Sequence, residues 1–76
     1  MEDRTFEIPT LTVALQPEGV SKTLPRHQAK NVIRLLETLG IRQGTAIVAR
    51  NGELLTPDRA LYAGDEVLVR RVTSAG

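Results

Sequence analysis

The stretch LYAGDEVLVRRV, residues 61–72, decides the predicted fold. Its Gly64-Asp65 pair is typical of a turn, because glycine and aspartate both favour turn conformations. The residues that follow, 66–72, contain three valines and a leucine in a segment short enough to be one β-strand. We therefore predict a last strand over residues 66–72, and its apolar content favours a central place in a sheet.

Two alternating segments near the start of the chain predict a hairpin. Residues 11–15 (LTVAL) and 20–24 (VSKTL) alternate apolar and polar side chains, which is typical of half-buried strands. Between them, Pro17-Glu18-Gly19 supplies turn residues. We expect residues 11–24 to form two paired strands.

A further pair of strands is predicted after residue 45. Residues 46–49 (AIVA) form a short continuous apolar run, which predicts a strand that is buried on both faces of a sheet and central in it. The Asn51-Gly52 pair is a strong signal for a tight turn. The segment Glu53-Leu54-Leu55 is therefore predicted to be a short return strand.

One helix is predicted between the hairpin and the later strands. Pro25 suits the first helical position, where a missing N–H leaves no hydrogen bond unmade. Apolar residues then recur at helical spacing on one face, with Leu35 beside them, and Gly40 ends the helix as its C′ residue. The residues on that face are Ala29, Val32, Ile33, Leu36 and Leu39.

These elements predict an α+β fold of the β-grasp type. One amphipathic helix packed on one face of a mixed sheet of four to five strands buries all the apolar stripes. Because the helix must return the chain to the same sheet, the first and last strands are expected to lie side by side and parallel. We assign residues 11–72 to this domain. Residues 1–10 are either a partly disordered lead-in or an extra edge segment, and residues 73–76 form a flexible C-terminal tail.

Size and composition exclude several classes of function. The chain has 76 residues, no cysteine and a single histidine, His27, which excludes disulfides and the common zinc sites. Its net charge of +1 provides no basic footprint for nucleic acid or an anionic membrane. One Tyr, one Phe and no Trp give little bulk to enclose a substrate. The composition therefore argues against a free-standing enzyme, and we expect no bound metal or cofactor.

The N-terminal sequence and the hydropathy predict a location in the cytoplasm. Residues 1–4 (MEDR) are polar and are followed by no apolar run of the kind found in signal peptides. No stretch approaches the roughly 20 apolar residues of a membrane span. The absence of thiols agrees with a reducing compartment. We therefore expect a cytoplasmic protein without membrane partners.

Four segments together resemble a known family. They are the helix over residues 29–39 that ends in Gly40-Ile41, the segment 46–52 (AIVARNG), the segment 61–67 (LYAGDEV), and the small tail Thr73-Ser74-Ala75-Gly76. From about Leu11 to Gly76 the chain resembles the ThiS/MoaD family of ubiquitin-like sulfur-carrier proteins.

The resemblance implies a carrier whose reactive group is its own C-terminus. In this family a ubiquitin-activating-type adenylyltransferase uses ATP to adenylate the terminal glycine carboxylate. A sulfur donor of the desulfurase or rhodanese type then converts it to a thiocarboxylate. A synthase accepts the sulfur in thiamine or molybdopterin biosynthesis, or the sulfur passes to a tRNA base. For this chain, Gly76 is the implied modified residue, and Thr73, Ser74 and Ala75 are the implied threading tail.

The chemistry of the tail is consistent with this role. A carboxylate becomes an acyl donor only when it carries a good leaving group such as AMP, and covalent carriage divides a hard transfer into easier steps. Small residues let the tail extend through a narrow channel. Ala75 departs from the family, which usually ends in Gly-Gly. Three explanations stay open: a tolerated variant, a sequence that stops one residue short of a further glycine, and a chain that is not used as a carrier.

Partner contacts are predicted at four residues, Arg70, Arg71, Leu55 and Tyr62. Only one of the two arginines can lie on the binding face, because successive strand residues point to opposite faces. The alternative for the arginines is a solvated strand end that protects a sheet edge. Leu55 and Tyr62, with Leu54 and Leu61, form either an exposed apolar patch or part of the core, and the small size of the domain favours the core.

No catalytic role is assigned to His27, Asp65 or Glu66.

The rival hypothesis is a β-grasp module that binds protein or RNA through its sheet surface alone. Such a module would keep its function when the tail is extended or deleted. The near-neutral charge argues mildly against the RNA-binding version, which would need a basic face.

Overall fold

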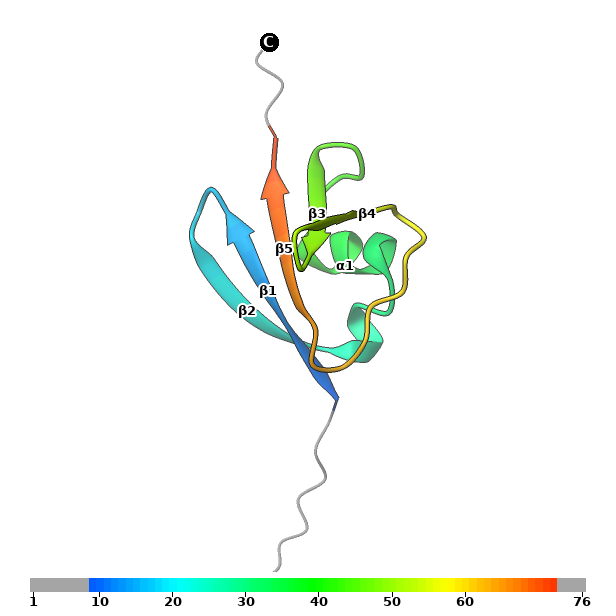
Figure 1. The fold of residues 1–76 in the computed structure, drawn as a ribbon. Coiled ribbons are helices and arrows are strands. Elements are labelled where there is room, and N and C mark those ends of the chain that lie inside the picture. The colour runs from blue at the N-terminus through cyan, green and yellow to red at the C-terminus, as the bar shows by residue number, and fades with distance from the viewer. Residues whose placement is uncertain (1–8, 73–76) are drawn as a thin grey trace, which may run out of the picture.

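The computed structural model describes residues 9–72, which form a five-stranded mixed sheet with one α-helix packed on one of its faces (Figure 1). The elements are β1 (Thr10–Gln16), β2 (Val20–Pro25), η1 (Arg26–Gln28), α1 (Val32–Leu39), β3 (Ala46–Arg50), β4 (Glu53–Leu55) and β5 (Glu66–Arg71). Across the sheet the strands follow the order β2-β1-β5-β3-β4. β5 is therefore the central strand, as its valine content predicts.

The strand pairing confirms the β-grasp prediction. β1 and β5 lie side by side and parallel, with Val13 opposite Val67 and Leu15 opposite Val69. The β1–β2, β3–β4 and β3–β5 pairs are antiparallel. The predicted hairpin is present, and its first strand begins at Thr10.

The core lies between α1 and the inner face of the sheet. Alternate residues of β1 and β5 point toward α1, as the two-residue period of a strand requires. Burying each leucine or valine of this kind stabilises the fold by about 1.5–3 kcal/mol relative to leaving it exposed. The buried residues are Leu11, Val13, Ala29, Val32, Leu35, Leu36, Val48, Leu55, Leu61, Val67 and Val69.

The helix begins later than the sequence pattern predicts. Pro25 has an extended backbone and ends β2, and a single 3₁₀ turn follows before Asn31 caps α1. The Asn31 side chain accepts a hydrogen bond of 2.8 Å from the Arg34 amide. The carbonyl of Lys30 accepts a hydrogen bond of 2.8 Å from the Leu61 amide, so this segment is held by the later loop and not by the helix. Tertiary pairing thus overrides the helical spacing of residues 29–31.

The end of the helix agrees with the prediction. Gly40 has φ of 73°, in the left-handed region, and its amide donates to the carbonyls of Glu37 and Leu36. Glycine adopts this conformation without the steric cost of a Cβ atom, which explains why the helix stops here. Ile33, which was predicted to lie on the buried apolar face of the helix, is 38% exposed.

β3 is not buried on both faces, contrary to the prediction from its apolar run. Val48 is 3% exposed and belongs to the core, whereas Ile47 is 43% exposed on the opposite face of the strand. Because α1 covers only one face of the sheet, the other face of β3 has no layer above it. β3 does have a neighbour on each side, β5 and β4, but the middle of the sheet is β5.

No helix within residues 9–72 is long and apolar enough to cross a membrane.

Candidate functional site

The end of β5 is the part of the described chain from which the predicted reactive tail departs. The amide of Val72 donates a hydrogen bond of 3.0 Å to the Thr45 carbonyl, so backbone pairing continues to the last described residue. Residues Thr73, Ser74, Ala75 and Gly76 lie outside the described residues. The surface around Val72 is therefore the candidate site for a protein that acts on the tail.

Arg70 and Arg71 lie on opposite faces at this end of the sheet. Arg71 pairs in register with Ala46 and its guanidinium forms an ion pair with Glu18, in the turn between β1 and β2. Arg70 pairs in register with Gln16 on one side and with Ile47 on the other. Both arginines are exposed. Arg70 therefore shares the face of the sheet that α1 leaves uncovered.

That uncovered face carries a row of apolar side chains. Ala14, Leu68, Ala49 and Leu54 stand opposite one another in four adjacent strands. Directly opposed residues in neighbouring strands point to the same face and lie within contact distance. We call these four residues together with Ile47 the outer-face patch. Its most exposed members are Leu54, at 65%, and Ile47, at 43%.

A small hollow adjoins the end of β5. It has a volume of about 290 Å³ and is lined by Pro17, Thr45, Arg71 and Val72. A larger apolar groove of about 410 Å³ lies between α1 and the β3–β4 pair. Leu54 and Ile47 belong to both the larger groove and the outer-face patch, so the apolar surface continues around the β4 edge.

Residues 54, 55, 61 and 62 were considered together in the sequence analysis, but they differ in burial in the structure. Leu55 is 8% exposed and Leu61 is fully buried, so both belong to the core. Leu55 is consequently not accessible to a partner, contrary to its place among the predicted contact residues. Leu54 is exposed on the outer face, contrary to the core interpretation. Adjacent residues of a strand point to opposite faces, so the sequence alone could have shown that Leu54 and Leu55 do not share a face.

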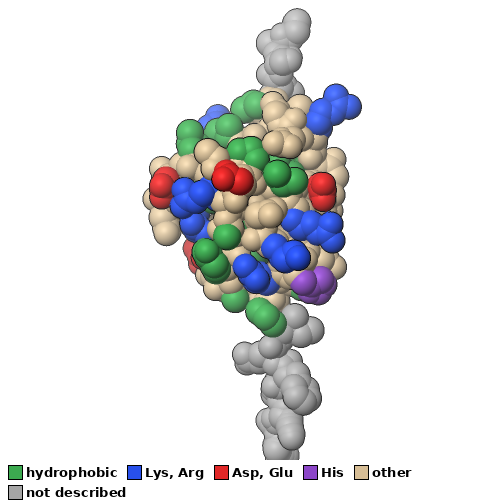
Figure 2. Space-filling model, turned by 90° about the vertical axis from the view of Figure 1, so that its right-hand side faces the viewer, with side chains coloured by type: hydrophobic (Ala, Val, Ile, Leu, Met, Phe, Trp, Pro, Cys, Tyr) green, Lys and Arg blue, Asp and Glu red, His purple; other side chains and the backbone are tan. Residues whose placement is uncertain are grey.

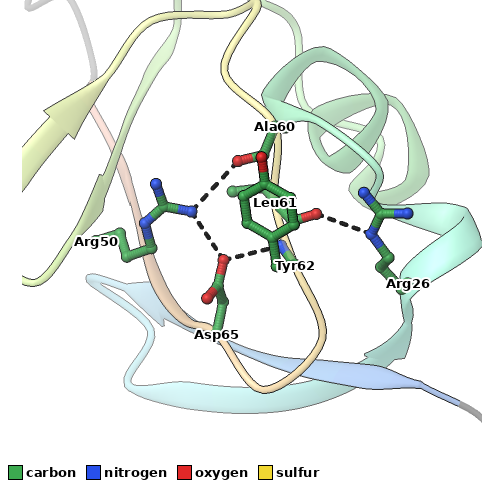
Figure 3. A network of polar contacts seen from close by, with 6 residues as sticks. All are labelled: Arg26, Arg50, Ala60, Leu61, Tyr62 and Asp65. Carbon is green, nitrogen blue, oxygen red and sulfur yellow. Dashed lines mark hydrogen bonds and ion pairs between the residues drawn. The ribbon is translucent and has the colours of Figure 1, made fainter.

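Tyr62 precedes the start of β5, whereas Arg70 lies near the end of this strand. Figure 3 shows Tyr62 close to Asp65, with Arg50 and Arg26 on either side. It is 56% exposed and follows the buried Leu61 in the loop before β5. The Tyr62 amide donates to the Asp65 carboxylate at 2.9 Å, and the Arg50 guanidinium donates to the same oxygen at 2.8 Å. Tyr62 therefore does not join the outer-face patch. Asp65 has a structural role that its Gly-Asp context alone did not predict, since Arg50 is distant in sequence.

Comparison with known proteins identifies the family. The sequence matches the model of the ThiS family over residues 13–70, which is most of the chain. This chain belongs to the ThiS family. The match ends at Arg70, on the last strand and just before the tail.

The structural comparison supports the fold of this ThiS-family chain. A solved structure described as a computationally designed protein based on the template of human erythrocytic ubiquitin superposes with a TM-score of 0.67. The two sequences are 21% identical, and the match covers 90% of this chain and 96% of the other. At this identity the likeness concerns the ubiquitin-like fold alone. No curated protein matches the sequence.

Membership of the ThiS family supports a general role in carrying sulfur. ThiS-family proteins are small carriers and not catalysts, and they interact with an activating enzyme and with sulfur-transfer partners. Within residues 9–72 no group of three or more His, Cys, Asp or Glu side chains is placed to hold a metal ion. Within residues 9–72, the exposed features near the end of β5 are the outer-face patch and Arg70.

Proposed function

We propose that this ThiS-family chain carries sulfur as a thiocarboxylate on Gly76. The carboxylate of Gly76 attacks the α-phosphate of ATP in the active site of an adenylyltransferase, which forms an acyl-adenylate and releases pyrophosphate. Sulfide displaces AMP directly as the new C–S bond replaces the C–O bond to AMP, whereas a persulfide of a desulfurase-type or rhodanese-type donor first forms an acyl disulfide, whose S–S bond a thiol reductant then cleaves. The product is a thiocarboxylate, which a synthase uses in thiamine or molybdopterin biosynthesis or in tRNA thiolation. Because activation consumes ATP, the cytoplasm is the expected compartment.

The observation that carries the proposal is the family match over residues 13–70. It begins within β1, includes β2, α1, β3 and β4, and ends within β5 at Arg70, so the small residues 73–76 lie beyond it. The last described backbone hydrogen bond, from Val72 to Thr45, ties the chain to the sheet just before that run. A tail of four residues can extend by about 13 Å, which is enough to take a terminal carboxylate from the domain surface into a partner's active site.

Docking on the activating enzyme is assigned to the outer-face patch and Arg70. An exposed apolar surface with a charged rim is the usual composition of a protein interface. Arg70 is on this face and opposite Ile47, so an acidic side chain of the enzyme can pair with it while the patch is covered. Arg71 points to the other face and already has Glu18 as its partner. Of the two arginines, Arg70 is therefore the proposed contact.

Ala75 is proposed to be a tolerated replacement for the usual penultimate glycine. Alanine adds one methyl group and restricts φ, but its extended conformation is unstrained. A channel that accepts Thr73 and Ser74 already admits side chains larger than a methyl group. We expect Ala75→Gly to raise the rate of activation by less than about tenfold. An increase of about 10–200-fold, which is what a poorly accommodated methylene costs in a pocket, would mean that Ala75 is not tolerated.

The proposal is tested by intact-mass spectrometry of the chain with its activating enzyme, ATP and sulfide. Replacement of one carboxylate oxygen by sulfur raises the mass by about 16 Da. Deletion of Gly76 should abolish the increase, whereas Thr73→Ser should preserve it as a matched change within the tail. If the chain without Gly76 gains sulfur equally well, the terminal carboxylate is not the carrier. If tail deletion leaves the cellular function intact, the rival interaction module is supported instead.

A further inference from the structure

Arg26 and Tyr62, which lie close together in Figure 3, form a second candidate contact site. The Arg26 amide donates to the Pro9 carbonyl at 2.8 Å, next to the start of β1. Tyr62 lies in the loop that leads to the start of β5. Since β1 and β5 are parallel, both residues lie where these strands begin, while the tail leaves where β5 ends.

The guanidinium of Arg26 is held in place at the surface. Its Nε atom donates a hydrogen bond of 2.9 Å to the Leu61 carbonyl, and its Cζ atom lies 5.6 Å from the centroid of the Tyr62 ring. Arginine has five N–H donors, and this bond uses only the one on Nε. Within residues 9–72 the two Nη groups have no hydrogen-bond partner, so with respect to this part of the chain they are open to a ligand. A side chain that is already fixed loses less conformational entropy when it binds an anion.

Two further cationic residues have backbone contacts in the same region of the fold. The Lys30 carbonyl accepts from the Leu61 amide at 2.8 Å, and the Arg59 carbonyl accepts from the Val32 amide at 3.1 Å, which brings both residues beside the same loop. His27 and Lys30 are exposed. In Figure 2, Lys and Arg side chains gather on one part of the surface next to a histidine.

Three carboxylates near this loop have partners within residues 9–72, whereas the exposed Glu66, which follows the loop, has none there. Asp65 binds the Arg50 guanidinium, Asp58 accepts a hydrogen bond of 2.7 Å from the Thr56 hydroxyl, and Glu53 is 3.9 Å from Arg59. No carboxylate of these described residues lies within ion-pair distance of Arg26, His27 or Lys30. Among the described residues, the unpaired charges near this loop are therefore those of Arg26 and Lys30 against that of Glu66, a positive excess in a chain whose net charge is +1.

We infer that Arg26, Lys30 and Tyr62 bind an acidic segment of a protein partner. A carboxylate can accept two parallel hydrogen bonds from a guanidinium, which gives both strength and orientation. A second acidic residue of the same segment reaches Lys30, and the exposed Tyr62 hydroxyl donates to either carboxylate. We call this set the Arg26–Tyr62 site.

The Tyr62 ring favours an acidic peptide over a nucleic acid as the ligand, because one of its two faces is already covered. Proteins that bind single strands stack bases on open aromatic faces. One face of Tyr62 is occupied by the Arg26 guanidinium, and Tyr62 is the one tyrosine in a chain without tryptophan. The Arg26–Tyr62 site therefore offers fixed donors for carboxylates and only one ring face for stacking.

The Arg26–Tyr62 site is separate from the proposed sulfur chemistry. It lies at the other end of β5 from the tail, so a partner can hold the domain there while the tail occupies a different active site. The inference does not depend on thiocarboxylate formation. It holds or fails independently of the proposed function.

The experiment is an NMR titration of the ¹⁵N-labelled chain with acetylated hexaglutamate, with hexaglutamine and hexauridylate as separate arms. We expect hexaglutamate to shift the Arg26 Nε resonance and the amides of residues 26–30 and 59–62 in a saturable, salt-sensitive manner. Hexaglutamine should cause no shift. Hexauridylate should bind more weakly than hexaglutamate at equal ionic strength.

Substitutions distinguish binding by the fixed guanidinium of Arg26 from non-specific electrostatic attraction to the chain. Arg26→Gln and Arg26→Lys should each weaken hexaglutamate binding by at least about fivefold, because lysine keeps the charge but lacks the fork and the Nε donor. Tyr62→Phe should weaken it less, and Lys22→Gln, a matched loss of one charge on β2, should have little effect. Unchanged amide spectra away from the site establish that each variant is folded.

Three results would overturn the inference. The first is the absence of saturable shifts at residues 26–30 and 59–62 with hexaglutamate. The second is an equal loss of binding in Lys22→Gln and Arg26→Gln, which would indicate diffuse electrostatic attraction. The third is tighter binding of hexauridylate, which would assign the surface to nucleic acid.

Discussion

Arg50, the last residue of β3, reaches the carboxylate of Asp65 at a distance of 2.8 Å and so ties the end of β3 to the loop that precedes β5. The two side chains are only 17% and 20% exposed. The same Asp65 oxygen accepts the Tyr62 amide, and the Arg50 guanidinium also donates to the Ala60 carbonyl at 3.3 Å. The ion pair therefore fixes the loop that presents Tyr62 and buries Leu61.

Replacing Asp65 should destabilise the domain. Asp65→Asn removes the charge but keeps an acceptor for the Tyr62 amide, and we expect a loss of about 1–3 kcal/mol in the free energy of unfolding. Asp65→Ala removes both contacts and should cost more. Urea denaturation followed by circular dichroism measures the difference. Glu66→Gln is the matched control on the adjacent, exposed residue, and an equal loss there would contradict the role of Asp65.

Leu54 and Leu55 provide a matched pair on the two faces of β4. Leu55→Ala should cost about 2–5 kcal/mol, because it opens a cavity in the core. Leu54→Ala should change stability by about 0.5 kcal/mol or less, because the side chain is exposed. Thermal unfolding of both variants tests the assignment of faces. Equal destabilisation would mean that the faces are assigned wrongly.

Substitutions of Asn31 test whether α1 begins directly after this residue, as the structure shows. Asn31→Ala removes the cap on the Arg34 amide and should reduce stability by about 0.5–2 kcal/mol. Asn31→Asp keeps a side-chain acceptor and should retain most of the stability. If α1 instead began near Ala29, residue 31 would be inside the helix and alanine would be the more stable choice. Chemical denaturation of the two variants therefore distinguishes the two starts.

Arg70 and Arg71 should differ in activation by the adenylyltransferase. Arg70→Glu reverses charge on the outer face and should lower kcat/KM for pyrophosphate release by at least about tenfold, because like charges across an interface repel. Arg71→Glu loses the ion pair with Glu18, an exposed contact that contributes about 0–1 kcal/mol, and should have a smaller kinetic effect. A larger effect at Arg71 would assign docking to the other face.

The sequence pattern was sufficient for the fold because its local signals agree with one another. The Gly64-Asp65 turn, the valines of β5, the Gly40 helix stop and the Asn51-Gly52 turn all support the same arrangement. Residues 29–31 were misassigned because their helical spacing competes with pairing to residues 59–61, which is a contact between distant segments. Local propensity carries no information about such a partner.

The candidate site was only partly predictable for a similar reason. Arg70 could be named from its place at the strand end, but its face follows from the register with Ile47. Ile47 itself was missed because a continuous apolar run does not reveal which face the helix covers. The partners of Tyr62 come from β3, η1 and the loop before β5, so their meeting depends on the completed fold.

The central claim is that the sulfur is carried at the end of the tail, and peptide mapping tests it most directly. Trypsin cleaves after Arg71 and releases residues 72–76 (VTSAG) as one short peptide. After reaction with the activating enzyme, ATP and sulfide, fragmentation of this peptide should place the entire mass increase of about 16 Da on Gly76.

Mapping also separates sulfur from oxidation, since Met1 gains nearly the same mass when it becomes a sulfoxide. The increase on residues 72–76 should require ATP and should be absent after deletion of Gly76. An increase confined to Met1, or one that appears on the tail peptide without ATP, would contradict the account.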